Sequence, residues 1–306
     1  MKYKSLGVIG PGNHFQNKIK PIIKSKNFFK IEGFLKKKKI NKKIFYSEKD
    51  FFKKKFDFVY IACPNELHEK YIIKSLNSGY NVICEKPFLT RSKNLKKIIK
   101  LSEKKKKLIF ECFMYVYHPV FSYVKKIIKK RKYGAIKHVV SNFKFPSLNK
   151  NNNKYFKKLG NGFFFDAAVY PISLENYLFK FKIKPKILHE NFKKEVDLRG
   201  HTFLDSNFVR RFYFWGEGQK YSNNLTIFFK NGSLFVDKFF SKAKNEKISI
   251  EIKTKGRSYF KQFKECDQFE KMFEVIKKNY NKNFFLRKNR ELIHRHYKLL
   301  DLIRSS

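Results

Sequence analysis

The sequence predicts an α/β domain with a doubly wound parallel sheet, followed by an α+β domain with an open, mainly antiparallel sheet. Three observations lead to this expectation. Short apolar strands alternate with helical patterns up to about residue 115, and a glycine-rich turn follows the first of these strands. After about Pro119, apolar side chains recur at every second position. We therefore place the two domains at residues 1–118 and 119–306.

The first half contains five strand-like segments that are nearly continuous in hydrophobicity, as expected for strands covered on both faces. They are Ser5–Ile9, Lys30–Leu35, Phe58–Ala62, Asn81–Cys84 and Leu108–Phe113. The clearest helix between them is Glu66–Ser78, with Gly79 just past its end as a C-cap. Strands that alternate with helices in this way predict a parallel sheet.

The second half begins with a helix over 121–131 and continues with strands that alternate in polarity. We expect these strands at 135–145, 207–215, 224–229, 234–240 and 247–254. Asn231-Gly232 separates two of them and predicts a hairpin with a type I′ turn, in which both central residues need positive φ. Helices over 267–278 and 290–304 close the chain, and the last of them is a candidate to return to the first domain.

The charge of the chain first suggests a different function. Seventy-one lysines and arginines against 25 acidic residues give a net charge of +46, which is typical of proteins that bind nucleic acid or anionic membranes. However, the enriched residues (Lys, Phe, Ile, Asn, Tyr) are those of A/T-rich codons. The lysines also lie on the outer faces of amphipathic patterns such as 94–107 and 122–132. We therefore interpret the charge as a solvated surface and expect no nucleic-acid ligand.

The cysteines and the apolar segments bear on location. The four cysteines form no CxxC pair and no Cys/His cluster, so we expect neither a disulfide framework nor a metal site. The first apolar stretch, Leu6–Ile9, is too short for a signal peptide, and no later stretch reaches membrane-spanning length. We expect a soluble, cytoplasmic protein without a membrane partner.

The segment Gly7-Val8-Ile9-Gly10-Pro11-Gly12 follows the first strand and opens a helix, which is where a dinucleotide-binding Rossmann turn must lie. Its glycines permit a tight turn and a close approach of the cofactor pyrophosphate. The third position of the G-x-G-x-x-G pattern is Phe15, a departure that would move the helix or shift its start. We expect the turn and the helix start, Gly10, Gly12, Asn13 and His14, to contact the cofactor.

Four further segments, in order along the chain, resemble the glucose–fructose oxidoreductase / inositol dehydrogenase (Gfo/Idh/MocA) family. Its T-P-N-x-x-H and E-K-P motifs match Cys63-Pro64-Asn65-Glu66-Leu67-His68 and Glu85-Lys86-Pro87. Its E-A-F-M-x-R-x-H-P and G-G-G-x-x-x-D-x-G-x-Y-P stretches match residues 111–119 and 160–171. Val116 and Ala168 depart from the Arg and Gly common in relatives. The resemblance covers most of the chain and is strongest from 58 to 172.

The resemblance implies an NAD(P)-dependent oxidoreductase. Such an enzyme transfers a hydride between nicotinamide and a secondary alcohol or ketone of a sugar, a cyclitol or a nucleotide-activated sugar. By this resemblance Tyr170 exchanges the hydroxyl proton, and Lys86 assists because a tyrosine of pKa about 10 needs a nearby cation to act near neutrality. Asp166, four residues before Tyr170, would orient the lysine or the substrate hydroxyl.

The remaining site residues follow from the same resemblance. Pro64, Asn65 and Glu85 would line the nicotinamide half of the cofactor. His68 would lie beside the cofactor or cap a helix, and Lys86 would also hold the nicotinamide ribose and the substrate oxygen. His118 would be either a substrate contact or a hinge residue. His294 and His296 are expected at solvated positions on the last helix.

The end of the second strand bears on the choice of cofactor. Dehydrogenases that use NAD usually carry an acidic residue there for the ribose hydroxyls, whereas this strand ends in Phe34-Leu35 and continues with four lysines, Lys36 to Lys39. A lysine run would attract a 2′-phosphate. We therefore expect NADP in preference to NAD, with Lys36 among its contacts.

Assembly and a second class of function remain to be weighed. An open sheet with an uncovered aromatic face (Phe208, Phe212, Phe214) predicts a homodimer or homotetramer formed through that sheet. The alternative function is a catalytically inactive Rossmann homologue with a regulatory, scaffolding or nucleic-acid-binding role. The departures at Phe15, Val116 and Ala168 are the features that keep this alternative open.

Overall fold

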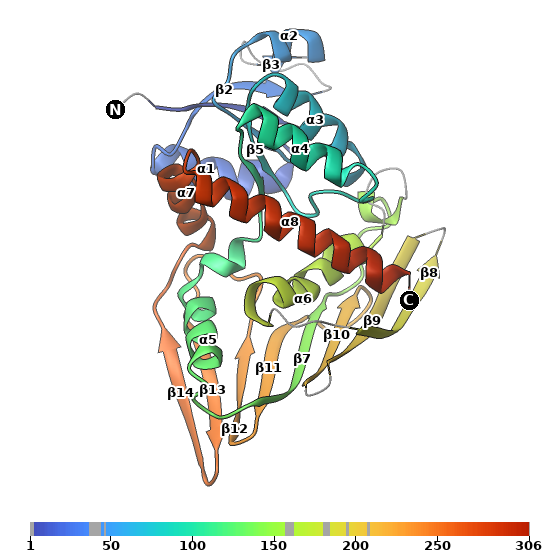
Figure 1. The fold of residues 1–306 in the computed structure, drawn as a ribbon, viewed down its shortest axis with the longest axis vertical. Helices are drawn as coiled ribbons and strands as arrows, with labels where there is room; N and C mark the ends of the chain where they lie inside the picture. The colour runs from blue at the N-terminus through green and yellow to red at the C-terminus, as the bar shows by residue number, and fades with distance from the viewer. Residues whose placement is uncertain are drawn as a thin grey trace. The chain divides into compact units, whose positions relative to one another are not determined.

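The computed structural model describes residues 3–36, 44–45, 47–156, 162–179, 184–193, 196–206 and 209–305. The chain forms two compact units, each built from separate parts of the sequence (Figure 1). Unit 1 contains residues 1–112 and 269–297, and unit 2 contains residues 113–268 and 298–306. The chain therefore leaves unit 1 near residue 113, and the penultimate helix and most of the last helix belong to that unit.

Unit 1 contains an entirely parallel sheet with the strand order β3-β2-β1-β4-β5-β6. The strands are β1 (Ser5–Ile9), β2 (Lys30–Leu35), β3 (Ile44–Phe45), β4 (Phe58–Ile61), β5 (Asn81–Cys84) and β6 (Ile109–Glu111). The five expected strands are all present, and the doubly wound fold is confirmed. The short β3 and the helix α2 (Glu48–Lys53) were not predicted, since lysines interrupt the apolar pattern around them.

Helices from both ends of the sequence cover this sheet. The first part supplies α1 (Lys20–Ser25), α3 (His68–Asn77) and α4 (Leu95–Lys105), and the last part supplies α7 (Gln268–Asn279) and α8 (Asn283–Arg304). Phe273 of α7 packs against Phe28 and Phe29, with ring centroids 5.9 and 6.1 Å apart. Phe285 of α8 stacks on Phe110 of β6 at 6.2 Å. Segments far apart in sequence thus share one aromatic core.

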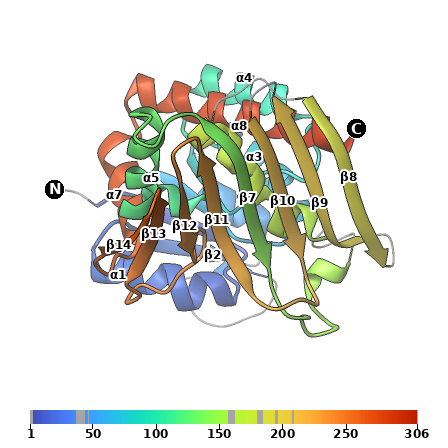
Figure 2. The ribbon, with the colours of Figure 1, turned by 90° about the horizontal axis from the view of Figure 1, so that it is seen from below.

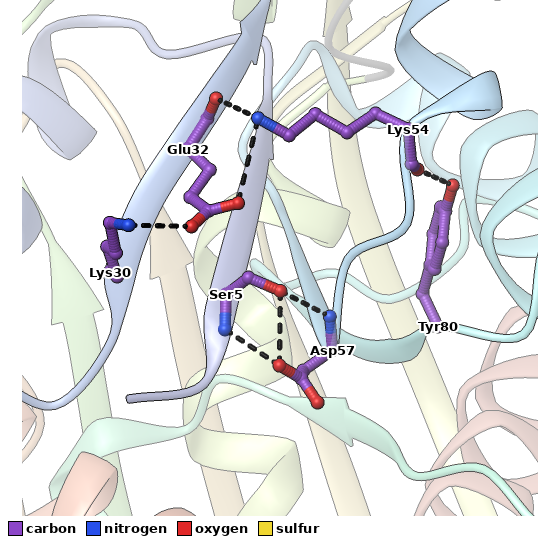
Figure 3. Close-up of polar contacts among 6 residues, drawn as sticks. All are labelled: Ser5, Lys30, Glu32, Lys54, Asp57 and Tyr80. Atoms are coloured by element: carbon purple, nitrogen blue, oxygen red, sulfur yellow. Dashed lines mark hydrogen bonds and ion pairs between the residues drawn. The ribbon is translucent and has the colours of Figure 1, made fainter. Parts of the chain in front are cut away.

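A polar clamp ties the amino ends of β1 and β4 together (Figure 3). The Asp57 carboxylate accepts hydrogen bonds from the backbone N–H and the hydroxyl of Ser5, at 2.9 and 3.1 Å, and the Asp57 N–H donates to the same hydroxyl at 2.9 Å. At the neighbouring strand, Glu32 pairs with Lys30 and Lys54. These bonds lie at the end of the sheet opposite the carboxyl ends of its strands.

Unit 2 contains an eight-stranded sheet in the order β14-β13-β12-β11-β7-β10-β9-β8. Its strands are β7 (Ile136–Lys144), β8 (Lys184–Lys193), β9 (Val196–Ser206), β10 (Val209–Gly216), β11 (Ser222–Phe229), β12 (Gly232–Asp237), β13 (Ile248–Thr254) and β14 (Arg257–Phe263). Only β7 and β10 pair in parallel, so the mainly antiparallel sheet is confirmed. The strands β8, β9 and β14 were not predicted.

The hairpin between β11 and β12 is confirmed, but the predicted turn type is wrong. The strands pair up to Gly232, so Lys230 and Asn231 form the turn, and neither of them has positive φ. Their N–H groups donate instead to the carbonyl oxygens of Ala135 and Tyr133, at 2.8 and 3.0 Å. These bonds to the segment before β7 replace the geometry that a free two-residue hairpin would adopt.

The two faces of this sheet differ (Figure 2). Helix α6 (Val169–Leu174) packs on one face against β7 and β10, and α5 (Pro119–Lys129) belongs to the same unit. The covered face holds buried side chains such as Trp215, Leu225 and Ile250. Aromatic side chains on the other face remain partly or largely exposed. Among the helices of the described ranges, none has the length and apolarity required to cross a bilayer.

Candidate functional site

Three loops of unit 1 meet at the carboxyl ends of its parallel strands. Gly10, which follows β1, has φ +68°, and a Cβ there would lie 2.5 Å from the Cα of Cys63, the residue that leads into Pro64 and Asn65. The Ala62 N–H donates to the Ile9 carbonyl at 2.9 Å, and the Glu85 N–H donates to the Ile61 carbonyl at 2.9 Å. The structure therefore brings together the expected cofactor segments around residues 10–14, 62–65 and 85–86.

Phe15 is accommodated by a local widening of the helix. The segment Phe15–Ile19 is π-helical, and the fully buried Phe15 ring packs against Phe34 and Tyr60, with centroids 6.3 and 5.4 Å away. A single π-turn inserts extra backbone without ending the helix. The bulky residue at the third motif position thus becomes part of the core, and the turn ahead of it is retained.

The turn and the helix start have the shape that a dinucleotide needs. A Cβ placed on Gly12 would have no neighbour nearer than the Gly10 carbonyl oxygen at 4.0 Å, so the space in front of the turn is open. Asn13 and His14 are exposed beside it. Lys36 is exposed directly after β2, whose last carbonyl accepts a hydrogen bond from Gly10 at 3.0 Å. The residues present therefore fit a dinucleotide; Lys37 to Lys39 lie outside the described residues.

His14, Glu85 and Tyr60 form a polar chain next to Lys86. The His14 Nε2 lies 3.3 Å from Glu85 Oε1, and the buried Tyr60 hydroxyl donates a short hydrogen bond to the same oxygen. Burial raises the pKa of Glu85, but the hydrogen bonds and charge of His14, Tyr60 and Lys86 outweigh it and hold the pKa below its usual value. Glu85 is therefore an anion in the middle of the expected site.

The cofactor contact expected of His68 is not available to its ring. The side chain is fully buried, and its two ring nitrogens lie 2.7 and 2.9 Å from the carbonyl oxygens of Pro87 and Cys63. Burial lowers the pKa of this histidine. The ring connects the loop that carries Asn65 to the loop that carries Lys86, so His68 lies beside the expected cofactor segments with both ring nitrogens already engaged.

Glu111 fixes the backbone that follows Lys86, a role that the sequence did not reveal. Its Oε1 accepts hydrogen bonds from the Phe88 N–H at 2.8 Å and from the Tyr297 hydroxyl at 3.0 Å. The same hydroxyl accepts from the Leu89 N–H at 2.9 Å. The available signal was a carboxylate within an apolar strand-like run, which a buried strand accepts only when it is hydrogen-bonded.

In unit 2, Tyr170 lies in an aromatic cage at the start of α6. Its ring packs 4.6 Å from Phe143 and 5.7 Å from Phe240, and its hydroxyl lies 3.7 Å from the sulfur of Met114. Six per cent of the residue is exposed. Ala168, where relatives carry Gly, has ordinary right-handed helical angles, so this position does not require glycine here.

Buried polar contacts hold the helix that carries Tyr170. The Ser173 hydroxyl donates to the Tyr170 carbonyl at 2.6 Å and shares a 2.5 Å hydrogen bond with the Tyr115 hydroxyl. Glu175 accepts from the Tyr213 hydroxyl and lies 2.9 Å from the buried Arg211 Nε. These residues were not predicted, because Tyr115, Arg211 and Tyr213 are distant in sequence from the helix.

Asp166 pairs with Lys154, a residue that sequence reasoning did not single out. Their charged atoms lie 2.6 Å apart, and the Lys154 ammonium also stands 5.4 Å from the Phe145 ring centroid. The Asp166 side chain is 13% exposed and lies in the first turn of the helical segment Phe164–Ala168, which leads to Tyr170. The carboxylate is thus oriented by a lysine of unit 2.

Two other histidines differ from expectation. His118 is fully buried and caps α5, with its Nδ1 accepting from the Val120 N–H at 3.2 Å, so a direct substrate contact is not available to this ring. Burial lowers the pKa of His118 to about 3. His296 is buried rather than solvated, whereas His294 is exposed as predicted.

Sequence relatives include reductases of dTDP-sugars, an inositol dehydrogenase and dihydrodiol dehydrogenases. A dTDP-3,4-didehydro-2,6-dideoxy-alpha-D-glucose 3-reductase from Streptomyces violaceoruber is 24% identical over 189 residues, 60% of this chain and 55% of that protein. A scyllo-inositol 2-dehydrogenase (NADP(+)) from Bacillus subtilis is 28% identical over 124 residues, 38% of this chain and 37% of that protein. The chain therefore matches little more than half the length of the first of these relatives and less of the second.

Solved structures with the same fold cover the whole chain. A 3-ketoreductase from Actinomadura kijaniata, in complex with NADP and TDP-benzene, superposes with a TM-score of 0.91 at 19% identity, over 99% of this chain and 98% of that chain. An aldose-aldose oxidoreductase from Caulobacter crescentus has a TM-score of 0.81 at 15% identity, with the same coverage. Mutants of the ketoreductase alter one lysine or one tyrosine, and the same number of residues separates these two as separates Lys86 from Tyr170.

Two family models match consecutive parts of the chain. Residues 4–113 match the oxidoreductase family with an NAD-binding Rossmann fold, and residues 121–199 match the GFO/IDH/MocA C-terminal domain. Together they span more than half of the sequence, in the order and at the positions of the two folds described above. The chain belongs to the Gfo/Idh/MocA oxidoreductase family.

Proposed function

We propose that this protein is an NADP-dependent oxidoreductase that interconverts a ketone and a secondary alcohol on a sugar, a cyclitol or a nucleotide-activated sugar. The observation that carries the proposal is the convergence of the Gly10–Gly12 turn, the Pro64-Asn65 loop and Glu85-Lys86 in one Rossmann unit. The sugar class is supported by the relatives, which act on dTDP-sugars and inositol. None of these comparisons supports the inactive alternative.

The residues of the chain divide the work in this proposal. The nicotinamide cofactor, when bound, supplies or accepts the hydride. Tyr170 exchanges the proton of the substrate oxygen, and Lys86 provides the positive charge that favours this exchange and binds the ribose. The lysine and tyrosine altered in the ketoreductase have the same spacing, which supports this pairing. Asp166, oriented by Lys154, binds a substrate hydroxyl.

The test compares two substitutions in steady-state turnover and in cofactor titration. Tyr170→Phe should lower turnover with a keto-sugar substrate by about 10²- to 10⁴-fold and leave the Kd for NADPH unchanged, because the phenol serves the substrate. Lys86→Ala should lower turnover and also weaken NADPH binding. The double variant should lose less than the product of the two effects, as expected for groups that act together. Unchanged turnover in Tyr170→Phe would refute the mechanism.

The preference for NADP rests on the end of β2. Lys36 is exposed there, and Glu32 of the same strand is engaged by Lys30 and Lys54. A cationic strand end favours a 2′-phosphate. We propose that NADPH binds more tightly than NADH, and equal or tighter binding of NADH in a fluorescence titration would contradict this.

We further propose that the protein works in the cytoplasm as a homo-oligomer formed through the open face of the unit 2 sheet. The four cysteines all lie within the described residues and form no disulfide there, which suits a reducing compartment. Partly exposed aromatic side chains, including Phe212 and Phe214, extend across that face of the sheet.

A further inference from the structure

His14 stands at the open side of the cofactor turn. It lies two residues after Gly12, and its side chain is 49% exposed. One side of the ring faces Phe269, with centroids 5.6 Å apart, and Nε2 faces Glu85 Oε1 at 3.3 Å. The ring is therefore held in place on two sides and remains accessible to a ligand in front of the turn.

The charges around this ring favour its cationic form. Burial lowers the pKa of His14, but the hydrogen bond and the charge of Glu85 outweigh it, so the pKa lies above its usual value of 6.5. Lys86 and Lys18 oppose this effect. The Tyr60 hydroxyl donates a hydrogen bond to Glu85 and helps to keep the carboxylate ionised. A protonated His14 is thus a fixed positive charge beside the turn.

We propose that His14, oriented by Glu85, binds the cofactor pyrophosphate as an imidazolium, so that cofactor binding depends on the protonation of this ring. The inference rests on the proposed function, because it assumes that a dinucleotide occupies the Gly10–Gly12 turn. Hydrogen bonds from a cation to phosphate are roughly twice as strong as neutral ones. The ring therefore contributes most while it carries its proton.

The direction of the pH effect follows from linkage. The bound pyrophosphate raises the pKa of His14 further, so the complex holds a proton that the free protein begins to lose at a lower pH. Affinity for the cofactor is highest below the pKa that His14 has in the free protein. It falls as the pH rises toward the pKa that His14 has in the complex. When the pH is above the pKa of His14 in the free protein, cofactor binding takes up a proton from the solution.

NADH is the probe of choice for this test. Its pyrophosphate does not titrate near neutrality, whereas the 2′-phosphate of NADPH is a monoester with a second pKa near 6, which would add its own pH dependence. We expect the Kd for NADH to rise about tenfold between about pH 6 and about pH 8.5. Calorimetry in two buffers of different ionisation enthalpy should show proton uptake within the same range.

Three variants test whether His14 and its pairing with Glu85 cause the pH dependence of NADH binding. His14→Gln, which can still bond to Glu85, should raise the Kd about tenfold at the acid end and flatten the profile. Glu85→Gln should move the fall in affinity to lower pH, with affinity restored in acid. His294→Gln changes an exposed histidine on α8 of the same unit and should retain the original profile. Thermal melting checks that each variant is folded.

The outcomes are distinct. If the wild-type protein binds NADH without proton uptake, or if His14→Gln keeps the wild-type profile, the role of His14 is refuted and the proposed activity is untouched. If the wild-type protein binds neither NADH nor NADPH, the proposed function itself fails. Should His14→Gln not fold, the proton uptake of the wild-type protein and the shifted profile of Glu85→Gln still decide the question.

Discussion

Glu111 illustrates how a single buried carboxyl group organises the loop that follows Lys86. Its carboxyl group accepts a hydrogen bond from the Phe88 N–H, two residues after Lys86, and another from the Tyr297 hydroxyl. Burial raises its pKa to about 7, although the N–H of Phe88, the hydroxyl of Tyr297 and the charge of Lys86 act in the opposite direction. The native state therefore binds a proton that an unfolded glutamic acid releases near its ordinary pKa, about 4.3.

This linkage predicts how stability changes with pH. Glu111 contributes fully to the free energy of unfolding when the pH is below its pKa in the unfolded chain. This contribution is lost as the pH rises through about 7. Glu111→Gln keeps an acceptor of the same shape, so the decline in unfolding free energy from about pH 5 to about pH 8 should become shallower by about 2–3 kcal/mol. Urea denaturation across this range measures it.

The control is Glu103→Gln, an exposed carboxyl on α4 of the same unit, which should leave the slope unchanged. Other buried groups such as Glu175 and Asp197 also titrate in this range, and they contribute equally to the wild-type protein and to the variant. The difference between the two curves therefore isolates Glu111, and identical curves would contradict the assignment.

Residue roles were the part of the site that the sequence predicted least well. The positions of the motifs in the sequence were sufficient to predict that the segments of Gly10, Asn65 and Lys86 lie close together. It was not sufficient for His68, His118 or His296, because the burial of a histidine depends on elements that pack on it from elsewhere in the chain. The partnership of His14 with Glu85 likewise joins two loops that no local pattern connects.

At the scale of elements, the clamp between Ser5 and Asp57 fixes the relative position of β1 and β4. It supplies three hydrogen bonds at the amino ends of two neighbouring parallel strands (Figure 3). Burial raises the pKa of Asp57, but the bonds to Ser5 and the charge of Lys4 outweigh it and the pKa lies below its usual value. Both proposed cofactor loops at the far ends of these strands depend on this register.

We expect Asp57→Ala to lower the unfolding free energy by about 1–2 kcal/mol at neutral pH, a range discounted for the exposure of the carboxyl. Because the pKa of Asp57 is depressed, its contribution is present above the unfolded value and lost as the pH falls through the folded value, so the deficit should shrink in acid. Asp50→Ala, on the exposed helix α2, is the matched control. Equal losses in the two variants would show that the clamp contributes nothing specific.

Elements were predictable where local pattern and tertiary environment agree. The parallel strands are short, apolar runs between helices, and all five longer ones were found within a residue or two of their ends. Strand β14 was missed because its side chains are mostly exposed and show no apolar alternation. The turn at residues 230–231 was misjudged because its hydrogen bonds go to another segment.

At the scale of the whole molecule, one row of side chains crosses the open face of the unit 2 sheet. Neighbouring pairs in the register join seven residues from seven strands: Phe203, Phe212, Val140, Thr226, Phe235, Glu251 and Phe260. Phe235 and Phe260 are 37% and 69% exposed, and the rings of Phe203 and Phe212 lie 4.9 Å apart. Phe208, expected on this face, lies outside the described residues. Four phenylalanines and Val140 make up most of this row, with Thr226 and Glu251 between them. The exposed aromatic side chains favour contact with a second copy of the chain.

The proposed oligomer predicts a mass of at least twice 37.0 kDa in light scattering after size exclusion. Phe235→Glu combined with Phe260→Glu places charges in the row and should shift the mass toward that of the monomer, because an unpaired charge in an apolar interface is costly. Phe284→Glu, at an exposed phenylalanine of α8 in unit 1, should not. A wild-type monomer at micromolar concentration would refute the interface.

The division of unit 1 between the two ends of the chain has a consequence for biosynthesis. Chains emerge from the ribosome amino end first, and a domain made of one continuous segment can fold before the rest is translated. Here Phe273, Phe285 and Tyr297 complete the aromatic core and the Glu111 hydrogen bonds, and all three follow residues 113–268 of the second unit in sequence. Part of the hydrophobic face of the nascent Rossmann sheet therefore stays uncovered while more than 150 further residues are synthesised. We expect ribosome-bound chains stopped before residue 269 to remain sensitive to protease where full-length chains are resistant.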